Sequence, residues 1–230
     1  MENKVILSPH LDDAIFSCWS IIQNKNTTVI TIFAGQPIKK TRTIWDAFCG
    51  EINSYKMMQK RKTENNNIMD SLYVNSIDLN YLDNQYDKNR PTINQIMNKV
   101  LSVCSSDCIF YVPLAISLLY RHPDHVITRN VGLALLERNK KVIFYADQPY
   151  MLLPTSLLLN NEKILTTKIK KDLKITGNIL VNKLKLDSQQ RKLNYMKKYE
   201  SQFKMTNLLA FNKLSKKKNL SAEFFFVPKS

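Results

Sequence analysis

Short apolar runs, rich in β-branched residues, recur along the first 150 positions of the chain, and stretches with helical spacing separate them. The segments 4–8, 28–33, 77–82, 108–113 and 141–146 predict strands, and the segments 13–23, 51–72, 91–103 and 124–138 predict helices. Several of these runs are continuously apolar, which is typical of parallel strands that are buried on both faces. The alternation of strand and helix predicts an α/β fold, a Rossmann-like three-layer sandwich with a mostly parallel, doubly wound sheet.

Beyond Pro154 the pattern changes. Apolar and basic residues alternate over 168–185, which favours a strand, while 188–204 resembles an exposed amphipathic helix and 223–227 a terminal strand. We therefore expect one domain over residues 1–230, with a doubly wound core in 1–150 and a basic α+β extension in 151–230 that shapes the site.

The charge of the chain is strongly positive and unevenly placed. The formal net charge is +15, and residues 160–230 carry 17 Lys and Arg against 5 Asp and Glu. Such a skew can indicate nucleic acid or another anionic partner. Because the chain is rich in Lys, Asn and Ile throughout and lacks a recognisable nucleic-acid motif, an anionic small substrate is the better interpretation, and we expect no specific nucleic-acid partner.

Several other classes of protein are disfavoured. No run of about 18 apolar residues exists, which argues against a membrane span, and the N-terminus lacks the apolar segment of a signal peptide, so a cytoplasmic protein is expected. The four cysteines are too few and scattered for a disulfide framework and are interpreted as reduced thiols. The oligomeric state is left open.

Polar residues gather where the first strand gives way to a helix, in the segment Ser8-Pro-His-Leu-Asp-Asp13. In open α/β sheets this turn is where ligands bind. His10 and Asp13 can face one point there and offer the ligand types that suit zinc, which leaves Asp12 free to handle protons. The alternative is helix capping, in which Asp12 or Asp13 accepts hydrogen bonds from first-turn N–H groups.

A second polar cluster, His122-Pro-Asp-His125, follows the fourth predicted strand. Since parallel strands end on the same side of a sheet, both clusters can converge on one crevice. The chain has three histidines, and all lie in these two segments. Their shared placement favours a functional site over capping.

Together, the two segments resemble the signatures of the LmbE/PIG-L family of zinc-dependent N-acetylglucosaminyl deacetylases. The resemblance extends over nearly the full chain, through Phe33-Ala-Gly35, 45–50, Arg61-x-x-Glu64, Asp83, 145–150 and Tyr199-x-Ser-Gln202. Two positions depart from the family pattern, since Leu11 replaces the usual Pro and Ala14 replaces a frequent Glu that is not a metal ligand.

The resemblance implies a role for each matching residue. His10, Asp13 and His125 would hold one Zn²⁺ per chain, with Asp12 as general base. His122, held by Asp124, would be a cationic group that stabilises the oxyanion, with Tyr120 as a second donor. Arg61 and Asp83 would bind sugar hydroxyls, although Arg61 could instead form a surface pair with Glu64.

These residues predict a zinc-dependent amidohydrolase that removes an N-acetyl group from an N-acetylglucosamine-type amino sugar or glycoconjugate. Two alternatives stay open from the sequence. One is a deacylase or carbamoyl hydrolase of a natural-product (antibiotic) intermediate, and the other is a non-catalytic binding protein on the same fold.

Overall fold

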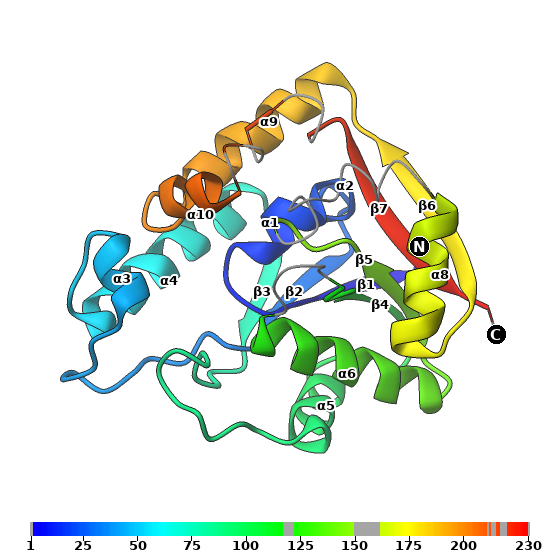
Figure 1. The fold of residues 1–230 in the computed structure, drawn as a ribbon, viewed down its shortest axis with the longest axis horizontal. Helices are drawn as coiled ribbons and strands as arrows, with labels where there is room; N and C mark the ends of the chain where they lie inside the picture. Colours follow the sequence, from blue (N-terminus) through cyan, green and yellow to red (C-terminus); the bar gives the residue numbers. More distant parts are fainter. Residues whose placement is uncertain are drawn as a thin grey trace.

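A mostly parallel sheet organises the computed structural model, which describes residues 2–116, 122–149, 162–210, 212, 215–216 and 220–229 (Figure 1). Within these residues the sheet has seven strands in the order β3-β2-β1-β4-β5-β7-β6. Their bounds are β1 Asn3–Ser8, β2 Thr27–Thr31, β3 Asn75–Asp78, β4 Cys108–Pro113, β5 Lys141–Tyr145, β6 Gly177–Lys183 and β7 Ala222–Pro228. Strands β1 to β5 pair in parallel, whereas β7 is antiparallel to both β5 and β6. The predicted fold class is confirmed.

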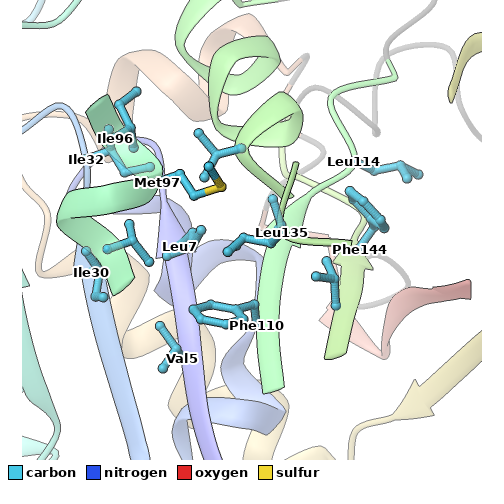
Figure 2. Close-up of a cluster of buried hydrophobic side chains, with 14 of the residues drawn as sticks. Val5, Leu7, Ile30, Ile32, Ile96, Met97, Phe110, Leu114, Leu135 and Phe144 are labelled. Atoms are coloured by element: carbon cyan, nitrogen blue, oxygen red, sulfur yellow. The ribbon is translucent and has the colours of Figure 1, made fainter. Parts of the chain in front are cut away.

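Helices cover both faces of the sheet, as Figure 1 shows. One face packs against α5 (Ile93–Ser102), α6 (Pro123–Glu137) and α8 (Glu162–Leu173), and the other against α1 (Asp13–Ser17), α2 (Trp19–Ile22), α4 (Ser54–Ser71) and α9 (Leu186–Lys197). Successive side chains of a strand point to opposite faces. Val5 and Leu7 accordingly join the α5/α6 core, part of which Figure 2 shows, while Ile6 joins the α1/α4 core. The short helices α3 (Ile44–Phe48) and α10 (Phe203–Leu209) complete the described helices.

The strand predicted over 168–185 is wrong in its first part, because these residues continue α8 and the strand begins only at Gly177. Leu165, Ile169 and Leu173 are buried in the same core, four residues apart. This spacing places them on one helix face. The alternation of apolar and basic residues therefore concealed a helical period.

The helix predicted over 13–23 is also interrupted, since α1 ends at Ser17 and α2 starts at Trp19. Glu223 of β7 accepts hydrogen bonds from the two N–H groups at the start of α2. Its Oε1 is 2.7 Å from the nitrogen of Trp19, and its Oε2 is 2.8 Å from that of Ser20. Lys192 donates to the same carboxylate at 2.7 Å, and both side chains are buried. The expected exposed helix at 188–204 therefore has a buried cation in its first half, and the chain continues as α10 only from Phe203.

The extension contributes strands to the core sheet rather than a separate layer, because β7 pairs directly with β5. Among the described residues, no helix combines the length and apolar character needed to cross a bilayer.

Candidate metal and active site

The two polar clusters meet at the carboxyl ends of β1 and β4, which are neighbouring strands. The chain leaves β1 toward α1 on one face and leaves β4 toward α6 on the other, so a crevice opens between the two connections. The ring centroids of His10 and His122 are 4.8 Å apart, and that of His125 lies 5.3 Å from His10 and 5.5 Å from His122. The predicted convergence of the clusters is thus present in the structure.

His10, Asp13 and His125 form a group whose ligand atoms all lie within 4.8 Å of one another. Oδ2 of Asp13 is 3.2 Å from Nδ1 of His10 and 3.2 Å from Nε2 of His125. Two imidazole nitrogens and one carboxylate oxygen are a donor set that suits a divalent transition metal such as zinc. The donors present fit the ion that the sequence predicts, and their assignment as ligands stays a prediction.

Helix capping does not account for these carboxylates. Asp12 is the N-cap residue of α1, yet its side chain makes no capping hydrogen bond. Asp13 accepts instead from the backbone nitrogen of His10 at 2.8 Å, and the N–H of Ala14 in the first turn donates to Oγ of Ser8. The capping alternative is therefore wrong for Asp12 and Asp13.

Burial and close charges perturb the protonation of the group. Burial alone would lower the pKa of His125, but the carboxylates of Asp13 and Asp147 outweigh it and raise this pKa to about 9. The pKa of Asp13 lies well below its usual range, because the attraction of His125 and His10 exceeds the effect of burial. Burial and the neighbouring charge of Asp13 raise the pKa of Asp12 to about 6. Positive charge is therefore favoured at the point where the donors converge, as binding of a cation requires.

Asp147, which follows β5, contacts the ring nitrogen of His125 that does not face Asp13. Its Oδ2 lies 2.9 Å from Nδ1 of His125, and its Oδ1 accepts from the backbone nitrogen of Ala115 at 2.8 Å. Metal-binding histidines commonly place their second nitrogen against such a carboxylate, which fixes the ring and the tautomer. Sequence reasoning did not assign Asp147 to the site, although its position directly after a predicted strand was an available signal.

Asp124 lies near His122, as expected, but its side chain is at the limit of ion-pair distance and its backbone makes the hydrogen bond. The carboxylate of Asp124 is 4.0 Å from Nδ1 of His122, and this nitrogen accepts from the backbone N–H of Asp124 at 3.3 Å. The pKa of His122 falls to about 3, mainly through burial and then through His10 and His125. A neutral ring that accepts at Nδ1 carries its proton on Nε2, so the lowered pKa and this geometry favour a neutral His122 that can donate from Nε2, in place of the expected cation.

Asp124 contacts both His10 of the site and residues of the segment 84–90. Arg90 forms an ion pair with Oδ1, while Oδ2 accepts from the backbone nitrogen of Asn84 at 3.1 Å and lies 3.0 Å from Nε2 of His10. Arg90 also donates to the carbonyl oxygen of Leu82 and stacks over the ring of Phe33 at 4.5 Å. Asp124 also belongs to a second group of potential ligand atoms, with His10, Asp83 and His122, but the guanidinium already neutralises Asp124.

Arg61 does not pair with Glu64, so the surface-pair alternative is wrong. Its Nη2 donates to Asp46 at 2.8 Å and its Nη1 to the hydroxyl of Tyr86 at 3.2 Å, and the side chain is buried. Glu64 accepts instead from the backbone and hydroxyl of Ser201. Because Asp46 and Tyr86 are distant from Arg61 in sequence, local spacing could not reveal them.

A cleft of about 530 Å³ opens in front of the two clusters. Its lining combines the catalytic candidates with polar and aromatic groups, namely His10, Asp12, Asp13, Trp45, Arg61, Asp83, Asn84, Gln85, Lys88, His122, Pro149, Gln202 and Thr206. Asp83 lies beside the first cluster, with Oδ2 3.6 Å from Nε2 of His10. Tyr120, the predicted second donor, lies outside the described residues.

Several solved structures have the same fold and align with nearly the whole length of this chain. The zinc-inhibited form of the teicoplanin deacetylase Orf2 has a TM-score of 0.74 at 19% identity and covers 99% of both chains. The A40926 pseudoaglycone deacetylase has a TM-score of 0.73 at 19% identity, with 99% of this chain and 97% of that chain covered. The N,N'-diacetylchitobiose deacetylase from Pyrococcus horikoshii has a TM-score of 0.59 at 14% identity, with coverages of 99% and 84%.

Family membership follows from the sequence match. Among curated protein sequences, none matches this chain. The model of the PIG-L family, described as GlcNAc-PI de-N-acetylase, matches residues 5–136, which span both polar clusters. The chain therefore belongs to the PIG-L family of de-N-acetylases, enzymes that hydrolyse the N-acetyl amide of an amino sugar.

Proposed function

We propose that this protein is a metal-dependent N-deacetylase that removes the acetyl group from an N-acetylglucosamine unit of a larger glycoconjugate. The observation that carries the proposal is the convergence of His10, Asp13 and His125 in one group of ligand atoms. His10 and Asp13 of this group line the cleft, and so does the neighbouring Asp12. Neither a carbamoyl hydrolase nor a non-catalytic binding protein is favoured by the family match.

His10, Asp13 and His125 would hold a divalent ion, which we propose to be zinc, one per chain. When bound, such an ion polarises a carbonyl and lowers the pKa of water to about 7. One solved structure of the teicoplanin deacetylase Orf2 is its zinc-inhibited form, so experiment must identify the ion that supports activity here.

The side chains around these donors suit the remaining steps of amide hydrolysis. Asp12 lines the cleft with a pKa of about 6, so its carboxylate can take the proton of the attacking water and later give it to the departing amine nitrogen. His122, with its proton on Nε2, can donate to the oxygen that gains negative charge. Cleavage of the C–N bond then releases acetate and the free amino sugar.

The cleft indicates a substrate larger than one sugar ring. A volume of about 530 Å³ lies in the range of sites that enclose drug-sized ligands. Arg61 and Asp83 line the cleft and would bind sugar hydroxyls, Trp45 offers an aromatic surface, and Lys88 adds a positive charge. This lining suits an N-acetylated sugar whose remaining part is polar or anionic.

The test combines metal analysis with an assay for released amine. The purified protein is stripped with a chelator, reloaded with one divalent ion at a time, and supplied with N-acetylglucosamine conjugates. His125→Ala should lose the ion, because one of three donors is gone. Asp12→Asn should keep the ion but lose at least about 100-fold in kcat, since it cannot accept a proton.

Asp70→Asn is the matched control, because Asp70 is exposed on α4 and should behave as the wild type in both measurements. An Asp12→Asn variant with full turnover would contradict the assignment of the base. A His125→Ala variant that still binds the ion stoichiometrically would contradict the ligand set.

A further inference from the structure

Large exposed apolar side chains lie on α3 and on both sides of it in the sequence. Ile44 and Phe48, one helical turn apart, are 77% and 63% exposed, and Ile38 and Ile52 on either side of the helix are 76% and 67% exposed. We call these four residues the α3 patch. Single exposed apolar residues are ordinary, but several large ones in one short segment mark an interaction surface.

Cations accompany the α3 patch, and negative charge is largely absent from it. Lys39, Lys40 and Arg42 are exposed beside Ile38 and Ile44. The acidic residues of the segment are Asp46, which is buried and paired with Arg61, and Glu51, which is partly buried and accepts from a backbone N–H. The outward charge of this segment is therefore positive.

The α3 patch adjoins the cleft through the residues between its members. Trp45, between the two exposed residues of α3, lines the cleft itself. Asp46 is joined to Arg61 on the inner side, and Oγ1 of Thr43 donates to Gln85, which also lines the cleft. Figure 1 shows α3 at the margin of the molecule, remote from the sheet. A surface that binds α3 would therefore lie beside the cleft that Trp45 and Gln85 line.

We propose that the α3 patch docks on an anionic lipid membrane, with Ile44 and Phe48 entering the boundary between headgroups and acyl chains. Apolar side chains flanked by Lys and Arg are the combination that such surfaces bind. The rival occupant is a second copy of the chain, but a two-fold contact through this patch would bring Lys39, Lys40 and Arg42 of both copies into one interface, where like charges repel. Charge therefore favours the membrane. The proposal goes beyond the proposed activity and does not depend on it.

Sedimentation with lipid vesicles measures the docking. Vesicles of phosphatidylcholine with about 30% phosphatidylglycerol should bind the full-length protein, and pure phosphatidylcholine should bind it weakly. Replacing Lys39, Lys40 and Arg42 together by Gln should reduce the partition coefficient at least about tenfold at physiological salt. Binding of the wild type that is equal for both vesicle types would overturn the proposal.

Because the whole protein is basic, electrostatic adsorption must be separated from insertion, and fluorescence does this. Trp45 adjoins the inserted residues, whereas Trp19, the other tryptophan, is fully buried. Lipids with brominated acyl chains should quench Trp45 in the wild type. The double variant Ile44→Ser/Phe48→Ser should lose this quenching, while Leu186→Ser, which changes an apolar residue with 71% exposure on α9, should retain it.

Circular dichroism and melting curves of the double variant establish that it is folded. Quenching that persists in the folded double variant would overturn the proposal. So would a wild-type dimer in lipid-free sedimentation that the same double substitution converts to a monomer, since the patch would then join two copies.

Discussion

Removal of the cation at position 192 should destabilise the fold strongly, because it leaves the carboxylate of Glu223 buried without its partner. Lys192 is 0% and Glu223 2% exposed, and Nζ lies 2.7 Å from Oε1. Breaking a buried pair on one side costs about 3–5 kcal/mol. Two backbone donors, from Trp19 and Ser20, would still bind the carboxylate, which places Lys192→Met near the lower end of that range.

The double variant Lys192→Met/Glu223→Gln tests the reasoning more sharply than the single change. It removes both charges, and the Gln amide oxygen can still accept from one of the two N–H groups that Glu223 now binds. The remaining unsatisfied N–H costs about 1–3 kcal/mol, so the double variant should be more stable than Lys192→Met alone. The non-additivity is the expected signature of a directly coupled pair.

Equilibrium unfolding in urea measures these differences, and a constant m-value shows that the unfolding transition itself is unchanged. Lys197→Met is the control, because Lys197 is exposed on the same helix and should alter the free energy of unfolding by less than about 0.5 kcal/mol. A loss below about 1 kcal/mol for Lys192→Met, or strict additivity in the double variant, would refute the account.

Three further changes test the site and its support. Asp147→Asn should weaken metal binding about 10- to 100-fold, measured by competition with a chromogenic chelator, because His125 loses the carboxylate at Nδ1; an unchanged affinity would exclude this support. Arg90→Met should lower kcat with little change in KM, and Arg90→Lys should restore part of the loss, because the cation that anchors Asp124 returns; equal defects in both would point to a packing effect. Gly35→Ala should lower the melting temperature, because a Cβ would lie 2.6 Å from the carbonyl oxygen of Asn80; a stable variant would show that this backbone can shift.

Much of the parallel sheet could be predicted because its central strands are continuous apolar runs, a pattern that depends on the residues themselves. The second half of the helix at 162–173 was taken for a strand, because alternate basic residues concealed the spacing of Leu165, Ile169 and Leu173. The interruption at Cys18 was missed for a different reason, since Glu223, which binds the freed N–H groups, lies about two hundred residues away.

In the candidate site, too, some residues could be predicted from the sequence and others could not. His10, Asp13 and His125 were identified because they lie in short motifs at strand ends, and the structure brings them together. The partner of Arg61, which is Asp46, and the partner of Asp124, which is Arg90, were not identified. Only tertiary packing brings these pairs together. Local sequence thus points to the candidate chemical groups better than to the groups that hold them in place.

The position of β7 between β5 and β6 has a consequence for biosynthesis. Phe144 of β5 pairs with Phe226 of β7, which the ribosome adds about eighty residues later. Until β7 has been synthesised, the edge of β5 that faces it has no partner strand. Until then the nascent chain presents an open row of backbone donors and acceptors, a template for unwanted pairing with other chains. Slow arrival of the last strand makes recruitment of a chaperone during translation advantageous for this topology.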